Sequence, residues 1–392
     1  MSSPLVSRSP DLQRLLREGY EIEIRSGYLL VKRVPFATSA GEVAFGTLIS
    51  ELSTSGSATI RPENHVAFFV SGIPCDNRGN QLSKIINSIG GNRLADGLTA
   101  DCMFSSKPPD GYPDYYAKMT AYANMISGWA QAVDPNVTAR SLVPVKMTES
   151  ESVFQYVDTA SSRAQISLIT GKLALPKVAV VGVGGTGAYV LDLIAKTPVS
   201  EIHLFDGDTF YAHNAFRAPG AASVEDLDAM PNKAEYHRDR YAAMRRGIIA
   251  HPYHIDESNI GELQDMTFVF LTTDPGPGKK FIVEKLEEYA LPFIDTGMGI
   301  LRTGDVLRGI VTATTSTPGH REHVWANKRI TFANGGGDYD DNIQIADLNM
   351  LNAVFAVIRW KKLCGFYADD ERELFTAYTI AANQLLNADQ LP

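Results

Sequence analysis

The segment VAVVGVGGTG at residues 178–187 constrains the fold of this chain more than any other part of the sequence. An apolar run typical of a buried strand leads into a glycine-rich turn, and a helical pattern follows directly. Gly182 permits a tight turn, Gly184 lets a phosphate approach the backbone, and Gly187 lets the helix pack closely. With Gly185 they place the amides of a helix amino terminus before a phosphate. The segment therefore predicts a nucleotide-binding turn.

Strand and helix patterns alternate after residue 150. Helices of this length between strands imply parallel crossovers, so we expect a doubly wound, Rossmann-like, mostly parallel sheet that binds ligands at the carboxyl ends of its strands. The predicted strands are 177–183, 201–206, 267–272 and 292–295, with helices at 187–196, 233–246 and 279–290. The later segments predict an antiparallel strand at 306–315 and a long apolar helix at 347–363.

A separate α+β domain is predicted for residues 1–150, with 151–392 forming the nucleotide-binding domain. We place the boundary near residue 150, because two prolines precede the polar stretch MTESES there. The predicted elements of the first domain are helices at 11–18 and 118–133, strands within 20–31 and at 65–70, and a loop at 104–116.

Composition excludes several classes of protein. With 44% hydrophobic and 21% charged residues, the chain resembles an ordinary globular protein. A net charge of -9 argues against a general affinity for nucleic acid or anionic membranes. Three scattered cysteines, Cys75, Cys102 and Cys364, exclude a cysteine-based zinc site and fit a reducing compartment. No apolar run approaches the roughly 20 residues of a membrane helix, so we expect a cytoplasmic protein.

The glycine turn and the next acidic residue do not identify the nucleotide. Asp206 ends the second predicted strand, where a carboxylate would hold the ribose hydroxyls of either NAD or ATP. Asp208 either assists a magnesium ion or caps the turn. An NAD-dependent oxidoreductase therefore stays open at this point.

The residues that follow favour ATP. Asn214, Arg217 and Lys233 follow the second strand, and a hydride-transfer enzyme has no use for a guanidinium and an ammonium group converging on its phosphates. An enzyme that directs attack on an α-phosphate does need them, because charge builds on the phosphoryl oxygens while pyrophosphate leaves. Asp274 ends a later strand on the same rim, where its carboxylate can hold Mg²⁺.

This ordered series resembles the ThiF/MoeB/ubiquitin-activating adenylyltransferase family, whose pattern runs Gly-x-Gly-Gly-x-Gly, Asp-x-Asp, Asn-x-x-Arg, Gly-x-x-Lys and a strand ending in Thr-Asp. The resemblance covers roughly residues 155–365 and implies ATP-dependent adenylation of a carboxylate. The roles it implies are ribose binding by Asp206, phosphate binding by Asn214 and Arg217, α-phosphate binding by Lys233 and magnesium binding by Asp274.

Two further residues take roles from the same resemblance. Family members contribute an arginine from a segment before the first strand, often across a dimer interface, and Arg163 resembles it, which implies a homodimer. The family also places an arginine five residues after the magnesium-binding aspartate. Here Lys279 stands at that place and becomes an expected nucleotide contact, while Pro275 replaces the usual asparagine.

The chain departs from thioester-forming members of the family, because the segment TTSTPGHREHV at 314–324, beyond the strand at 306–315, contains no cysteine. The enzyme would then either stop at the acyl-adenylate, as MoeB-like members do, or pass the acyl group directly to another protein. Ser316 is a poor acceptor, because a hydroxyl needs an adjacent base. We interpret Cys75 and Cys364 as a turn cysteine and a packing cysteine, since no histidine near Cys75 would lower its pKa.

The first domain carries a resemblance of its own, through VPFATSAGEVAFGTL, SGIPCD and FSSKPPDGYPDYY. It resembles the domain that precedes ThiF-type enzymes in bacterial operons encoding ubiquitin-like proteins, conjugating-enzyme-like proteins and a protease. This implies a partner-binding domain, a ubiquitin-like substrate ending in glycine, a conjugating-enzyme-like partner and a role in bacterial defence. Activation of a sulfur carrier protein, as by MoeB or ThiF, is the alternative, and a scaffold without activity is another.

Two smaller clusters complete the candidates. The tyrosines Tyr112, Tyr115 and Tyr116 either anchor an interface or fold back onto the core of their own domain. His320, Glu322 and His323 lie within four residues, and such adjacent positions rarely converge on one metal ion, so we interpret them as solvated surface.

Overall fold

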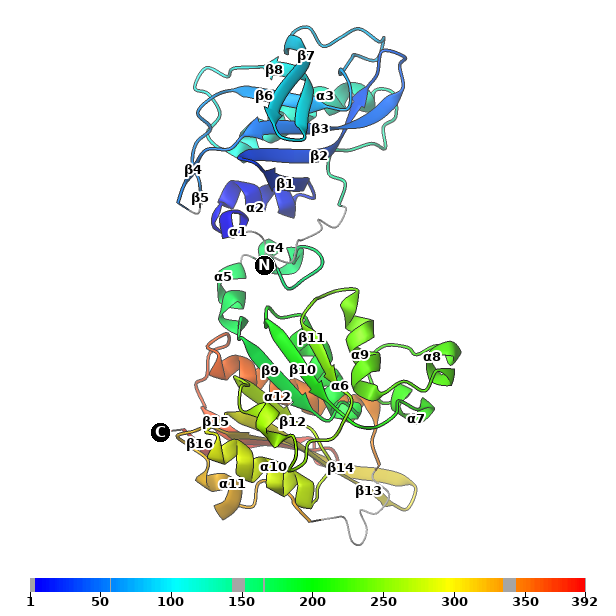
Figure 1. The fold of residues 1–392 in the computed structure, drawn as a ribbon, viewed down its shortest axis with the longest axis vertical. Helices are drawn as coiled ribbons and strands as arrows, with labels where there is room; N and C mark the ends of the chain where they lie inside the picture. Colours follow the sequence, from blue (N-terminus) through cyan, green and yellow to red (C-terminus); the bar gives the residue numbers. More distant parts are fainter. Residues whose placement is uncertain (1–3, 57, 143–151, 165, 334–342, 392) are drawn as a thin grey trace. The chain divides into compact units, whose positions relative to one another are not determined.

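The chain forms two compact units, Met1–Leu168 and Ile169–Pro392, coloured blue to green and green to red in Figure 1. The computed structural model describes residues 4–56, 58–142, 152–164, 166–333 and 343–391. The predicted boundary near residue 150 lies outside the described residues, so it stays a prediction. Within the described ranges, no helix is long and apolar enough to cross a membrane.

The first unit is built on a six-stranded antiparallel sheet in the order β1-β2-β3-β6-β8-β7. Its strands are β1 (Glu21–Arg25), β2 (Tyr28–Ala37), β3 (Val43–Glu51), β6 (Val66–Val70), β7 (Ile86–Ala95) and β8 (Leu98–Ser105), with a separate pair β4 (Thr54–Ser55) and β5 (Ala58–Thr59). Its helices are α1 (Pro4–Arg8), α2 (Pro10–Arg17), α3 (Tyr115–Gln131) and α4 (Thr159–Arg163). The predicted separate α+β domain is confirmed.

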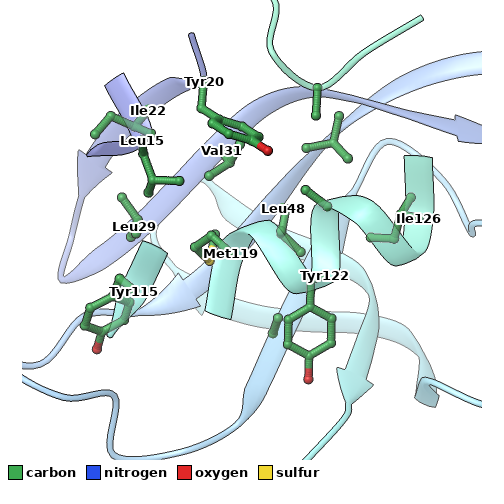
Figure 2. Close-up of a cluster of buried hydrophobic side chains, with 14 of the residues drawn as sticks. Leu15, Tyr20, Ile22, Leu29, Val31, Leu48, Tyr115, Met119, Tyr122 and Ile126 are labelled. Atoms are coloured by element: carbon green, nitrogen blue, oxygen red, sulfur yellow. The ribbon is translucent and has the colours of Figure 1, made fainter. Parts of the chain in front are cut away.

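Helix α3 covers the sheet of the first unit (Figure 2). It begins after Asp114, whose carboxylate accepts a hydrogen bond from the Ala117 amide at 2.7 Å. Met119 and Ile126 on the helix pack in one cluster with buried side chains of β2 and β3. Tyr112 and Tyr115 are also buried, so of the two readings left open, these two tyrosines belong to the core of their unit.

The second unit contains an eight-stranded sheet in the order β11-β10-β9-β12-β13-β14-β15-β16. The strands are β9 (Lys177–Val181), β10 (Glu201–Phe205), β11 (Ile248–His251), β12 (Phe268–Leu271), β13 (Phe293–Thr303), β14 (Val306–Ser316), β15 (Glu373–Thr379) and β16 (Gln384–Gln390). Pairing is parallel from β11 to β13 and antiparallel from β13 to β16. The predicted doubly wound, mostly parallel sheet is therefore confirmed.

Both faces of this sheet are covered. Val178 and Val180 on β9 pack in one core cluster with α6 (Gly185–Ala195) and α12 (Ala346–Leu363), while Ala179 and Val181 join a second cluster with α10 (Pro277–Glu288). The alternation follows from the two-residue period of a strand. The other helices are α5 (Ser167–Thr170), α7 (Ala212–Ala215), α8 (Val224–Asp228), α9 (Lys233–Ala242) and α11 (Glu322–Ala326), with short 3₁₀ turns at Gly171–Leu173 and Ile260–Leu263.

The order of the parallel strands places the candidate site. The chain moves from β9 outward to β10 and β11, then crosses back to β12 on the other side of β9. Ligands of such sheets bind at this switch in strand order, outside the carboxyl ends of the strands. The glycine turn after β9 and the segment after β12 therefore meet at one rim.

One element is longer than its pattern predicts. The strand expected at 292–295 continues to Thr303, because all of β13 pairs antiparallel with β14, from Phe293 opposite Ser316 to Thr303 opposite Val306.

Candidate active site

The glycine turn is held tightly on one side and open on the other. Gly182 has a positive φ of 86°, and its N–H donates to the Phe205 carbonyl at 2.8 Å. A side chain at Gly187 would collide with the Gly182 carbonyl oxygen and the Thr272 hydroxyl. An added Cβ at Gly184 would meet no atom within 4 Å. The turn therefore presents the backbone around Gly184 to a ligand while Gly187 serves packing.

Gly185 serves packing as well. A Cβ there would run into the side chain of Asn349 on α12. Thr186 donates from Oγ1 to Asn349 Oδ1 at 2.8 Å, so the start of α6 is fastened to α12.

Asp206 joins the glycine turn to the turn after β10. Its carboxylate is buried and accepts from the Val183 N–H at 2.8 Å and from the Asp208 N–H at 3.0 Å. Burial raises the pKa of Asp206. Both carboxylate oxygens keep further lone pairs that can accept from ribose hydroxyls. The placement is therefore compatible with the predicted ribose contact, which itself stays a prediction.

Lys233 lies beside Asp208 at the start of α9. Its Nζ is 2.7 Å from Asp208 Oδ2, and this hydrogen bond lowers the pKa of Asp208. Asn232 caps the helix, accepting from the Ala234 N–H at 2.8 Å, and its Nδ2 donates to the Asp206 carbonyl at 2.8 Å. The cap thus orients Lys233 toward the turn that follows β10.

An open cavity of about 390 Å³ lies next to this pair. Asp208, Asn214 and Lys233 line it, together with Gly207, Thr209, Tyr211 and His213. The structure therefore brings three of the predicted site residues to one cavity.

Two buried donors in the segment after β10 lack acceptors among the described residues. Asn214 accepts from the Tyr211 N–H at 2.9 Å through Oδ1, but its Nδ2 has no hydrogen-bond partner within the described residues. The same holds for Nε of Arg217. Leaving a buried donor unsatisfied costs about 1–3 kcal/mol, so an anionic ligand would relieve an existing cost.

Asp274 lies exposed in the segment after β12. Burial lowers the pKa of Arg217, and the charge of Asp274 acts against that shift, so the two side chains interact electrostatically. Of the predicted phosphate-binding residues, Arg217 is thus the one with which Asp274 interacts.

A different group of potential metal ligands stands in the described part of the chain. Ligand atoms of Asp206, Asp208 and His254 lie within 4.8 Å of one another, with His254 Nε2 3.4 Å from Asp208 Oδ1. Carboxylate oxygens suit Mg²⁺, but an imidazole suits it less well. No role for His254 follows from the sequence pattern, and the metal role of Asp274 stays a prediction.

Lys279 has a different partner from the one expected. Its Nζ is 2.6 Å from Asp295 Oδ1, and the two side chains are only 2% and 3% exposed. The predicted nucleotide contact therefore does not match this placement: the ammonium group is sealed in the interior against a carboxylate of β13.

Two family models match separate parts of the chain. Residues 163–320 match the model of the ThiF family, and residues 10–159 match that of a domain of unknown function, DUF6791. Residues 163–320 are a ThiF-family domain. The family predicted from the residue series is thereby confirmed for this part of the chain, and the separate match fits the extra amino-terminal domain.

Several solved structures are similar in fold. E. coli MccB with ATP shares 18% identity at a TM-score of 0.43, over 57% of this chain and 66% of the MccB chain. E. coli MccB alone shares 18% sequence identity at a TM-score of 0.44, over 57% of this chain and 64% of the MccB chain. PaaA shares 19% identity at a TM-score of 0.44, over 57% of this chain and 76% of the PaaA chain. The chain thus spans slightly less than two thirds of these MccB chains. No curated protein matches the chain.

The remaining candidate residues lie elsewhere or have side chains outside the described residues. Arg163 ends α4, but the position of its side chain is not described, so its role stays a prediction. Burial raises the pKa of the Cys75 thiol, and that of Cys364 to about 11, which disfavours thiolates. Ser316 is fully buried, and its Oγ has no partner within the described residues. His323 Nε2 lies 2.9 Å from the Thr315 carbonyl.

Proposed function

We propose that the ThiF-family domain uses ATP and Mg²⁺ to adenylate a polypeptide carboxylate. The observation that carries this proposal is the pair of unsatisfied buried donors, Asn214 Nδ2 and Arg217 Nε. Asn214 lines the same cavity as Lys233, and the glycine turn supplies further amides. Such a set of donors suits a phosphate group better than a nicotinamide ring.

The proposed reaction is a substitution at the α-phosphorus. A carboxylate oxygen of the substrate forms a bond to the phosphorus, and the bond to the oxygen bridging to the β-phosphate breaks. Pyrophosphate leaves and an acyl-adenylate remains. Lys233 and Arg217 would stabilise the charge that develops on the phosphoryl oxygens. Magnesium, held by Asp274, would neutralise the phosphates.

We further propose the substrate and the assembly. The substrate is the carboxyl-terminal glycine of a ubiquitin-like protein, passed on to a conjugating-enzyme-like partner. The enzyme works as a cytoplasmic homodimer in which Arg163 of each protomer reaches the nucleotide site of the other. The resemblance of the first domain to domains encoded beside ubiquitin-like proteins supports this choice of substrate. The segment directly after β14, TPGHREHV at 317–324, contains no cysteine, which supports release or direct transfer of the acyl group from the adenylate.

Replacing Asp274 by Ala tests the reaction. We expect ATP–pyrophosphate exchange, measured with the carboxylate substrate present, to fall at least about 100-fold, because the loss removes charge stabilisation at the phosphates. Asp305→Ala is the matched control, since Asp305 is an exposed aspartate in the β13–β14 turn. Near-normal exchange by the Asp274→Ala variant would refute the assignment.

Two further measurements test the nucleotide and the substrate. ATP with Mg²⁺ should raise the melting temperature of the protein, whereas selective stabilisation by NAD would favour an oxidoreductase instead. A ubiquitin-like protein with a free terminal glycine should gain the mass of one adenylyl group when incubated with ATP and the enzyme. Adenylation of a sulfur carrier protein alone would support the alternative substrate.

A further inference from the structure

The ion pair between Lys279 and Asp295, here called the sealed pair, links the start of α10 to β13. At 2% and 3% side-chain exposure, it cannot meet a ligand from solvent. Burying two charges costs desolvation energy that their attraction often only just returns. Stability alone is therefore a weak reason for such a pair, and its other contact suggests a second reason.

That contact is to the backbone beside Asp274. Lys279 Nζ donates to the Thr273 carbonyl at 3.2 Å. The preceding residue, Thr272, is fastened to the strand and turn of β9, because its N–H donates to the Val181 carbonyl at 2.9 Å and its hydroxyl donates to the Gly182 carbonyl. The residues just before Asp274 are thus held from two sides, by the glycine turn and by Lys279.

The segment between β12 and α10 has few backbone donors with which to hold itself. Of its five residues, TTDPG at 272–276, one is a proline without an N–H group, and Pro277, the first residue of α10, also lacks one. Gly276, at the helix start, offers no side-chain cap. A side chain from the helix that bonds to the Thr273 carbonyl therefore supplies a restraint that the backbone lacks.

We infer that the sealed pair is a positioning device for Asp274: Asp295 holds the Lys279 ammonium group, which holds the Thr273 carbonyl and so the backbone that carries the Asp274 carboxylate. Its consequence for magnesium rests on the proposed function, whereas the restraint on the backbone does not. Lys279 and Asp295 touch neither substrate nor metal in this role.

The double variant Lys279→Met/Asp295→Asn removes both charges without leaving either one buried alone. Hydrogen–deuterium exchange of the full-length protein, without ligands, is the first readout. We expect the amides of residues 272–276 to exchange at least about 10-fold faster, which corresponds to about 1.4 kcal/mol of lost local protection. The amides of β9 and β12 should keep their rates. Asp295→Asn alone keeps the Lys279 donor but leaves its charge buried without a carboxylate, so it should also raise the exchange of the same segment.

Lys285→Met is the matched control, because Lys285 lies on the same helix and its pair with Glu288 is exposed. It should leave the exchange of residues 272–276 unchanged. Unchanged exchange in both the double variant and Asp295→Asn would overturn the inference. An equal increase across β9, β12 and the segment would overturn it too, since that would mean a purely structural pair.

The second readout is the Mg²⁺ concentration at half-maximal ATP–pyrophosphate exchange. The double variant should need about 10-fold more Mg²⁺ than the wild type, with a smaller change in the rate at saturation. A wild-type protein without exchange activity would refute the proposed function but leave the hydrogen-exchange result to decide the positioning role. An unaltered Mg²⁺ requirement in an active double variant would refute the positioning of Asp274.

Discussion

Two lysines of the second unit occupy similar places and have different surroundings. Lys233 is the first residue of α9, and Lys279 is the third residue of α10. Each is buried and lies within 2.7 Å of an aspartate oxygen, Asp208 for Lys233 and Asp295 for Lys279. The side chain of Asp208 is 55% exposed and lines the cavity, whereas that of Asp295 is 3% exposed. We call the pair of Lys233 and Asp208 the open pair.

The difference shows which lysine can change partners. In the open pair, a phosphate can displace Asp208, because that carboxylate regains water as it leaves. In the sealed pair no such exchange is possible, since either charge would be left in the interior without a partner. A buried lysine near a helix start is therefore a ligand-binding candidate only where its partner reaches solvent.

The largest expected effect concerns stability and the sealed pair. Lys279→Met should lower the free energy of unfolding by about 3–5 kcal/mol, because Asp295 is left as an uncompensated buried charge. Burial already raises the pKa of Asp295 to about 6 against the opposing effect of Lys279. Without the lysine this pKa should rise further, and protonation at lower pH should relieve part of the loss. Urea unfolding at pH 8 and pH 5 measures both effects.

A small loss of stability in Lys279→Met at both pH values would contradict the contrast between the sealed and the open pair. Lys233→Met is the reference for this measurement. Because Asp208 is more than half exposed, losing its partner should cost no more than about 1 kcal/mol. Equal losses in the two variants would mean that exposure of the partner does not distinguish the pairs.

The next effect concerns activity and the open pair. Lys233→Met should reduce ATP–pyrophosphate exchange by about 10²- to 10³-fold, or about 3–4 kcal/mol in the barrier, because one donor to the phosphoryl oxygens is lost. The fold should persist, so the melting temperature without nucleotide serves as the control. Exchange within a few-fold of the wild type would show that Lys233 stays with Asp208 during the reaction.

Much of the candidate site could be predicted from the sequence because its signals are local. The conformation of Gly182 and the packing of Gly187 follow from a strand, a turn and a helix adjacent in the chain. The parallel sheet then brings Asp274 to the same rim, since the carboxyl ends of neighbouring strands share one edge. Local pattern and sheet topology are sufficient for this part.

The rest depends on contacts between distant residues. Nothing in the spacing around Lys279 indicates that Asp295 seals it, and a lysine at that position looks the same in sequence whether it meets a phosphate or a carboxylate. Gly185 similarly looks like a point of ligand approach, whereas Asn349 on α12 explains it by packing. The contact of His254 with Asp208 also depends on the path of the chain after β11.

A smaller effect, of pH on stability, tests whether water is excluded from the buried side of α9, the helix that carries Lys233 of the open pair. His237 lies one turn after Lys233 on α9, is 1% exposed and packs against the edge of Phe210. Burial lowers the pKa of His237 to about 4, from 6.5. Between these values the unfolded chain binds a proton that the folded protein does not, so stability should fall as the pH falls through this window. The loss should reach up to about 3 kcal/mol at pH 4.

His237→Phe keeps a ring in the same place and removes the titrating group, so shared effects of pH cancel between the two proteins. We expect the variant to gain stability relative to the wild type as the pH is lowered from 7 to 4 in urea unfolding. A stability difference that does not change with pH would mean that water reaches His237. The interior beneath Lys233 would then be open as well, and the contrast between the two lysines would rest on Asp295 alone.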